Sequence, residues 1–226
     1  MQDVMNRLIS ASLLLLLLGC SPPAPLKVGT LPVIDALPLS VAHHKPIFVE
    51  NKLAVDMVHF SEPLELRNAL INGDVDAIIT DLAEAFLINE SREFGKIVRV
   101  SLKPSQDRHE QTVIIFSQRM VEKKPAVIRR FLRAYEQSVR EINIRPWRYL
   151  PLAREFVRVP IGVSTKMPIP IFPFPGEAPS EAAVESAGAL LLMNKIISRP
   201  VSYNQLVNPG FLWDPSQFKP ASCCGW

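Results

Sequence analysis

The sequence predicts an α/β domain in which a mostly parallel sheet is flanked by helices. From residue 26 to about residue 100, short apolar and β-branched runs alternate with segments of helical pattern. This alternation is typical of parallel strands joined by helices. Residues that start and stop helices stand at the boundaries between the runs, and a long helix with one apolar face follows later in the chain.

The expected strands are short. We place the first at 26–30 and expect a mostly buried second strand at 54–60, where only two polar residues interrupt the apolar run. Three more apolar runs, at 75–80, 96–102 and 113–116, complete the predicted sheet.

Helix boundaries follow from capping residues. Asp35 is expected to open a helix through about residue 42. Ser61 or Glu62 is expected to cap a helix that has Pro63 in its first turn and ends at Asn72-Gly73. Further helices are predicted at 82–89, begun by Asp81 with Glu84, at 125–142, begun by Pro125, and at 181–194, capped by Ser180; the proline-rich stretch 168–179 is a loop.

The N-terminus has the pattern of a secretory signal. Arg7 precedes an apolar run at 8–18, which is shorter than the roughly 20 residues that span a bilayer. Leu17-Leu18-Gly19-Cys20 is similar to a lipobox, in which a thiol is needed because diacylglycerol is attached as a thioether. We therefore expect removal of 1–19, lipid on Cys20 and an extended tether over 20–25; an ordinary signal with a chance cysteine is the alternative.

Composition excludes several classes. The 48% hydrophobic and 21% charged residues are those of a globular protein. The net charge of +3 is mild, and with export it argues against nucleic acid as a partner. The sequence holds no zinc-binding cysteine spacing, no Gly-x-Ser-x-Gly and no His-Glu-x-x-His, so no catalytic residue, metal or cofactor is expected. His43-His44 is interpreted as a surface pair, and Cys223-Cys224 in the tail 213–226 as a vicinal disulfide, an intermolecular pair or inert thiols.

Several segments together resemble one family. They are 27–39 (KVGTLPVIDALPL), Phe60-Ser61, 69–77 (ALINGDVDA), the helix 125–142, Ile169-Pro170, Phe172-Pro173 and 203–207 (YNQLV). In order and spacing they resemble the substrate-binding proteins of nitrate, taurine, aliphatic-sulfonate and thiamine-precursor ABC importers, which have the type II periplasmic binding protein fold. The resemblance covers 26–103 and 111–212.

The resemblance implies two lobes, but the chain has room for one. In the family, the chain leaves the first lobe near Lys103, builds the second lobe and returns at a strand like 111–117. Here only seven residues, 104–110, stand between these points, whereas an independent domain takes about 50. We therefore expect a single lobe over 26–212, with the returning strand antiparallel to the others.

The resemblance also implies a ligand site outside the carboxyl ends of the strands, where helix N-termini present free N–H groups. Position by position this gives Asp35 and Ala36 after the first strand, Ser61 and Glu62 after the second, and Thr80 and Asp81 after the third. Asp35 could accept hydrogen bonds from a pyrimidine, and Ser61 and Thr80 could hold a polar head group. Helix capping is the alternative role for Asp35, Ser61 and Thr80.

The expected function is that of a solute-binding lipoprotein of an ABC importer, for a thiamine-precursor pyrimidine, a sulfonate or a nitrate-like anion. Its partners would be that solute, bound weakly by one lobe, an ABC permease, and the membrane of the cell envelope through Cys20. In a homodimer, the second copy could cover the side of the ligand site that the absent second lobe would have covered. The alternative is a lipid-anchored interaction module or degenerate allele that no longer captures solute. An enzyme is not expected, because the cysteine-rich motif of relatives in thiamine pyrimidine synthesis is absent.

Overall fold

The computed structural model describes residues 24–104, 111–157 and 168–212. Its centre is one five-stranded sheet in the order β2-β1-β3-β5-β4. The strands are β1 (Leu26–Thr30), β2 (Val55–His59), β3 (Ala77–Asp81), β4 (Gly95–Leu102) and β5 (Thr112–Ser117). β1 is parallel to β2 and β3, whereas β5 runs antiparallel to both β3 and β4. The prediction of one antiparallel strand in a mostly parallel sheet is therefore confirmed.

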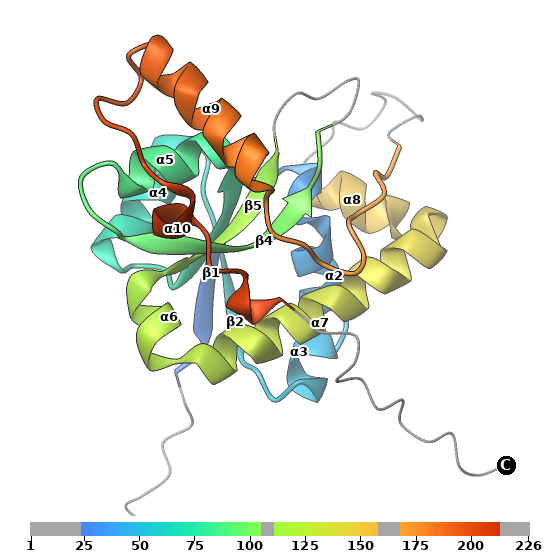
Figure 1. Ribbon diagram of the computed structural model, residues 1–226. Coiled ribbons are helices and arrows are strands. Elements are labelled where there is room, and N and C mark those ends of the chain that lie inside the picture. The colour runs from blue at the N-terminus through green and yellow to red at the C-terminus, as the bar shows by residue number, and fades with distance from the viewer. Residues whose placement is uncertain (1–23, 105–110, 158–167, 213–226) are drawn as a thin grey trace, which may run out of the picture.

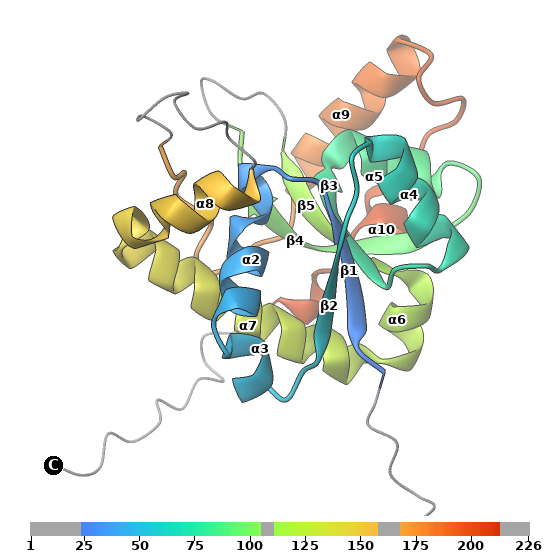
Figure 2. The same cartoon turned by 180° about the vertical axis from the view of Figure 1, so that it is seen from behind.

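Helices cover both faces of the sheet, which gives three layers (Figures 1 and 2). One face packs against α2 (Leu37–His44), α3 (Ile47–Glu50), α7 (Pro125–Ile144) and α8 (Leu150–Phe156). The other packs against α4 (Pro63–Asn72), α5 (Leu82–Asn89), α9 (Glu181–Met193) and α10 (Tyr203–Leu206). The remaining short elements are α6 (Gln118–Lys123), η1 (Ile34–Ala36), η2 (Pro146–Tyr149) and η3 (Pro209–Phe211). The α/β class with a single sheet is confirmed.

The long helix α7 forms because apolar residues repeat on one of its faces. Ile128, Phe131, Tyr135, Val139 and Ile142 are all fully buried against the sheet and α2. At this spacing the side chains form one stripe, and Pro125 at the start supplies a fixed φ where no N–H is needed. The helix holds the middle of one layer.

Two predicted details are wrong. The second strand was expected to be mostly buried, but residues along β2 are half-buried or exposed because β2 is an edge strand. The first helix was expected to open at Asp35. Residues Ile34–Ala36 instead form a 3-10 turn and α2 begins at Leu37, with no side-chain cap, because the Asp35 carboxylate is engaged with Thr112.

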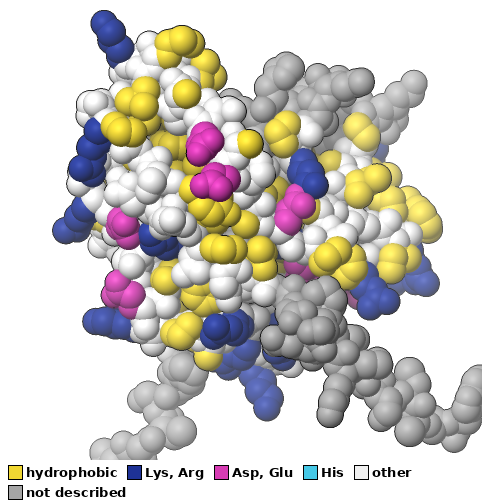
Figure 3. Space-filling view, viewed as in Figure 1, with side chains coloured by type: hydrophobic (Ala, Val, Ile, Leu, Met, Phe, Trp, Pro, Cys, Tyr) yellow, Lys and Arg dark blue, Asp and Glu magenta, His cyan; other side chains and the backbone are white. Residues whose placement is uncertain are grey.

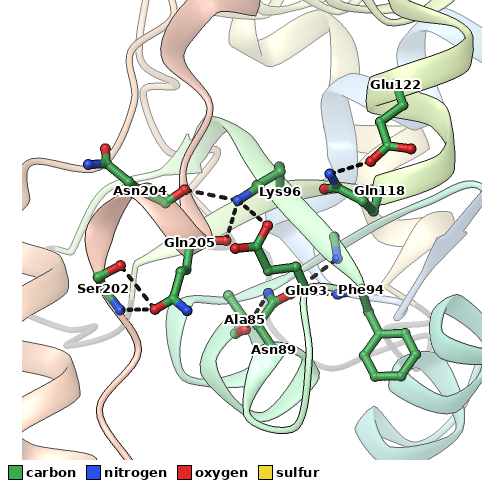
Figure 4. Close-up of polar contacts among 11 residues, drawn as sticks. Ala85, Asn89, Glu93, Phe94, Lys96, Gln118, Glu122, Ser202, Asn204 and Gln205 are labelled. Atoms are coloured by element: carbon green, nitrogen blue, oxygen red, sulfur yellow. Dashed lines mark hydrogen bonds and ion pairs between the residues drawn. The ribbon is translucent and has the colours of Figure 1, made fainter.

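The C-terminal part of the chain is fastened to β4. Lys96 donates from Nζ to the backbone carbonyls of Asn204 at 2.9 Å and Gln205 at 2.7 Å, and pairs with Glu93 at 2.9 Å (Figure 4). Ser202 and Gln205 form a capping box at the start of α10. Because a lysine near a helix C-terminus satisfies carbonyls that lack helical partners, this contact fixes α10 on the sheet.

Several predictions lie outside the described residues. They concern the signal segment 1–19, Cys20 and most of its tether, most of the short connection 104–110, and the tail with Cys223 and Cys224. Within the described residues, no helix has the length and apolar character needed to cross a membrane.

Candidate functional site

The candidate site lies where the strands end. β1, β2 and β3 are parallel, so their carboxyl ends meet at one edge of the sheet. The last residue of β3, Asp81, is the register partner of Thr112, the first residue of β5. Thr112 is also the partner of Leu102 at the end of β4. The same edge therefore receives the start of β5 and the ends of the parallel strands.

Asp35 is held at this edge by two hydroxyl groups. Thr112 donates to its carboxylate, and Ser101 donates from Oγ to its backbone carbonyl at 2.7 Å. The Asp35 side chain is almost fully buried, with 9% of the residue exposed. Two hydrogen bonds from neighbouring strands fix the direction of the turn that precedes α2, and with it the position of Ala36, which is fully buried.

Asp81 lies next to Asp35 through Thr112, whereas Thr80 is the register partner of Val113. Thr80 is buried, and Asp81 accepts a hydrogen bond at 2.8 Å from the backbone N–H of Glu84. The expected cap on α5 is thus present, although Glu84 pairs with Arg67 at 3.4 Å rather than reaching back to the cap. The backbone N–H of Leu82 donates to the carbonyl of Gln111 at 2.8 Å, so two N–H groups in the first turn of α5 have partners within the chain. This turn begins at the same edge as Asp35.

Ser61 and Glu62 stand farther along the edge. They follow β2, which is separated from β3 by β1, and both are exposed. Glu62 holds the N-cap position of α4, but its side chain makes no cap hydrogen bond. The structure thus brings Asp35, Ala36 and Asp81 together around Thr112, with Ser61 and Glu62 at the margin of this group. Thr80 faces the other side of the sheet, with its partner Val113.

Behind this group lies a buried polar network that sequence reasoning missed. The Ser101 hydroxyl is 2.6 Å from the hydroxyl of Tyr135, and the guanidinium of Arg99 lies 4.9 Å from the centre of the Tyr135 ring. Arg99 in turn pairs with Glu136 at 3.2 Å. Burial raises the pKa of Tyr135 to about 12, so its hydroxyl stays protonated.

The network ends on the proline-rich loop. Arg99 donates from Nη2 to the backbone carbonyl of Pro173 at 2.8 Å, and the backbone of Gly176 is hydrogen-bonded to Glu136. Val100 donates its backbone N–H to the carbonyl of Glu177 at 2.8 Å. Residues 173–177 are therefore fixed along β4, and a continuous chain of polar contacts joins them to Asp35.

The sequence did contain signals for this network. Glu136 and Ser138 interrupt the apolar stripe of the 125–142 helix, and Arg99 stands inside the apolar run Ile97–Leu102. Charged residues at positions that must be buried need charged or polar partners. Of these three residues, Arg99 and Glu136 carry opposite charges, which is the signal in the sequence that they are partners.

A separate cavity lies beside the edge strand. Its volume is about 360 Å³ and it is formed by α2, β2 and α8. Its walls include His43, His44, Asp56, His59 and Phe156, and the expected exposure of His43 and His44 is confirmed. In the part of the chain that the structure describes, no three His, Cys, Asp or Glu side chains are placed to hold a metal ion.

Comparison with known proteins relates the fold to one class. Residues 52–147 match the family model described as NMT1/THI5 like. A search of the curated proteins finds no match.

Solved structures agree over most of the chain. The periplasmic aliphatic sulphonate binding protein SsuA from Escherichia coli is 11% identical with a TM-score of 0.65, covering 82% of this chain and 98% of that one. The ligand-binding component of an ABC-type import system from Staphylococcus aureus, solved with zinc bound, is 11% identical with a TM-score of 0.61, covering 82% and 97%. A sulfonate-binding SsuA from Methylobacillus flagellatus is 9% identical with a TM-score of 0.62, covering 83% and 92%.

These structures are binding proteins, two of them described as parts of ABC transport systems, and their likeness to this chain lies in the fold. The chain therefore has the fold of the periplasmic binding proteins, and its residues 52–147 are similar to the NMT1/THI5-like family.

Proposed function

We propose that this protein is a lipid-anchored, solute-binding component of an ABC importer, and that its solute binds at the sheet edge around Asp35. The observation that carries the proposal is the grouping of Asp35 and Asp81 around Thr112 at the carboxyl ends of the parallel strands. Open α/β sheets bind ligands at this edge. The solute-binding role follows the binding proteins that share the fold.

The chemistry of the site favours a solute that donates hydrogen bonds. The carboxylates of Asp35 and Asp81 accept hydrogen bonds, whereas the N–H groups of Leu82 and Glu84 at the start of α5 are already bonded to Gln111 and Asp81. An aminopyrimidine carries an amino group that donates hydrogen bonds. A thiamine-precursor pyrimidine therefore fits better than a sulfonate or nitrate, which would face two carboxylates.

The affinity should be low. A two-lobed binding protein encloses its ligand, and tight binding of small molecules needs such enclosure. If the second lobe normally provides half of a binding free energy of about −8 kcal/mol, the first lobe alone retains roughly −4 kcal/mol, which corresponds to a millimolar dissociation constant. A homodimer that covers the edge with a second copy would restore the affinity.

A second candidate is a lipid-anchored interaction module that no longer captures solute. The observation in its favour is the short connection between Leu102 and Thr112, which leaves no chain for a second lobe at this point. In that case, the sheet edge would contact a protein, such as a permease, rather than a small molecule.

Calorimetric titration of the protein with an aminopyrimidine, an alkanesulfonate and nitrate distinguishes the two candidates. We expect millimolar binding of the aminopyrimidine that is lost in Asp35→Asn and kept in the control Asp74→Asn, which is exposed and outside the candidate site. Absence of binding by all three solutes, at concentrations of about 10 mM, would favour the interaction module.

A further inference from the structure

The C-terminal end of α7 carries an exposed apolar patch. Ile144 is 58% exposed, Trp147 in the following 3-10 helix is 67% exposed, and Ile171 is 85% exposed. Asn143 fixes the two segments together, because its side chain donates to the carbonyl of Phe172 at 2.8 Å and accepts from the Phe172 N–H at 3.0 Å. We call Ile144, Trp147 and Ile171 the α7-end patch.

Basic side chains surround this patch. Arg140, Arg145 and Arg148 are all exposed, and Figure 3 shows hydrophobic side chains with Lys and Arg beside them at this end of the molecule. Residues 137–157 hold four arginines and two acidic residues, Glu141 and Glu155. Glu141 is paired with Lys45 and accepts a hydrogen bond from Tyr149. The surface around the patch therefore has a net positive charge.

We propose that the α7-end patch binds the surface of a membrane that contains anionic lipids. Tryptophan favours the interface between head groups and hydrocarbon, and isolated apolar side chains can insert beside it. Each basic residue near an anionic surface adds about 1 kcal/mol to the attraction, which is about a fivefold gain in partitioning. The three arginines and the three apolar side chains thus match the two components of such a surface.

The same charges disfavour a second copy of the chain as the occupant. In a two-fold dimer the same patch lies on both sides of the interface, so Arg140, Arg145 and Arg148 of the two copies would be brought together. Like charges brought together in this way are repulsive. The anionic lipid surface is the occupant that complements the patch.

Quenching of Trp147 fluorescence by brominated lipid tests the proposal directly. The full chain contains three tryptophans, so Trp213→Phe with Trp226→Phe leaves Trp147 as the one reporter. We expect quenching by vesicles of brominated phosphatidylcholine with phosphatidylglycerol, weaker quenching at high salt, and none with brominated phosphatidylcholine alone. The charge variant Arg140→Gln/Arg145→Gln/Arg148→Gln should lower partitioning at least about tenfold.

A matched control uses the second exposed apolar surface of the protein. Leu190→Ser/Met193→Ser removes two exposed side chains from α9 and should leave the quenching unchanged. Absence of quenching, or equal quenching by neutral and anionic vesicles, would overturn the proposal. Shielding of Trp147 that grows with protein concentration in the absence of vesicles would also overturn it, since a second copy would then be the occupant.

Discussion

Arg99 and Glu136 form an ion pair in the interior of the protein. Nη2 of Arg99 lies 3.2 Å from Oε1 of Glu136, and their side chains are only 1% and 10% exposed. Arg99 Nε and Glu136 Oε2 have no hydrogen-bond partner in the described structure. Backbone groups also contact the pair, since Arg99 donates to the carbonyls of Val100 and Pro173 and Glu136 is hydrogen-bonded to the backbone of Gly176. The two opposite charges offset each other in the interior, and the pair joins β4 to α7.

Loss of one partner should be costly. Arg99→Met leaves the Glu136 carboxylate buried without its cation, and we expect a loss of about 3–5 kcal/mol in the free energy of unfolding. Arg99→Met/Glu136→Leu should recover much of this loss, because both charges are then removed. Urea denaturation measures all three proteins.

The matched control for this prediction is an exposed pair. Arg119 lies 3.0 Å from Asp76, but the Arg119 side chain is 63% exposed. Arg119→Met should cost less than about 1 kcal/mol, since water screens the interaction. Equal losses in Arg99→Met and Arg119→Met would contradict the role assigned to burial.

Glu136 should give the stability a distinctive pH dependence. Burial raises the pKa of Glu136 above its usual value, although the nearby Arg99 opposes the shift. A raised folded-state pKa means that the folded protein holds this proton more tightly than the unfolded chain does. The contribution of this proton to the free energy of unfolding is therefore complete below the unfolded-state pKa of about 4.3. It is lost as the pH rises through the folded-state pKa of Glu136.

Glu136→Gln removes this titration. The free energy of unfolding of the natural protein, minus that of Glu136→Gln, should fall as the pH is raised from about 4 towards 7. Urea denaturation at a series of pH values gives this difference. A difference that rises over the same range would show that attraction by Arg99 outweighs burial.

Gly176 should not tolerate a side chain. A Cβ at this position would collide with Glu136 Oε1 and lie 2.9 Å from Arg99 Nη1, so Gly176→Ala should cost about 1–3 kcal/mol through overpacking. Gly73 is the contrasting case, since it has open space but a φ of +81°. Gly73→Ala should cost about 1 kcal/mol and Gly73→Asn less, whereas Gly176→Asn should be worse than Gly176→Ala. The order of the four melting temperatures decides the point.

Cys20 should carry the membrane anchor. Cys20→Ser removes the thiol that accepts diacylglycerol, so we expect the precursor to remain uncleaved and to incorporate no labelled palmitate. Equal labelling of the natural protein and Cys20→Ser would contradict the anchor.

The sequence predicted the bounds of the helices and strands better than it predicted how far each of them is buried. Local signals were sufficient for α5, whose bounds match the expected 82–89, and for the end of α4 at Gly73, because a cap and a left-handed turn are local features. Exposure of β2 was missed, since the position of a strand in a sheet depends on pairings that a single run of residues does not encode.

In the candidate site, too, the positions of single residues along the chain were predictable, whereas their contacts with distant residues were not. Asp35 and Asp81 were expected from their places after strands, but their common neighbour Thr112 is 77 residues from Asp35 in the chain. In the sequence, nothing distinguishes Thr112 from any other threonine in a strand. Only the antiparallel return of β5 beside β3 brings Thr112 to both residues.

Mapping the solute by amide chemical shifts tests the central claim most directly. In a titration of the ¹⁵N-labelled monomer with the aminopyrimidine, we predict shifts concentrated at the amides of Ala36, Leu37, Leu82, Ala83 and Thr112, with a dissociation constant in the millimolar range. Shifts concentrated instead at His43, Asp56 and Phe156 would place the solute in the cavity beside β2 and contradict the assigned site. Binding tighter than about 10 μM by the monomer would contradict the claim that a single lobe binds the solute weakly.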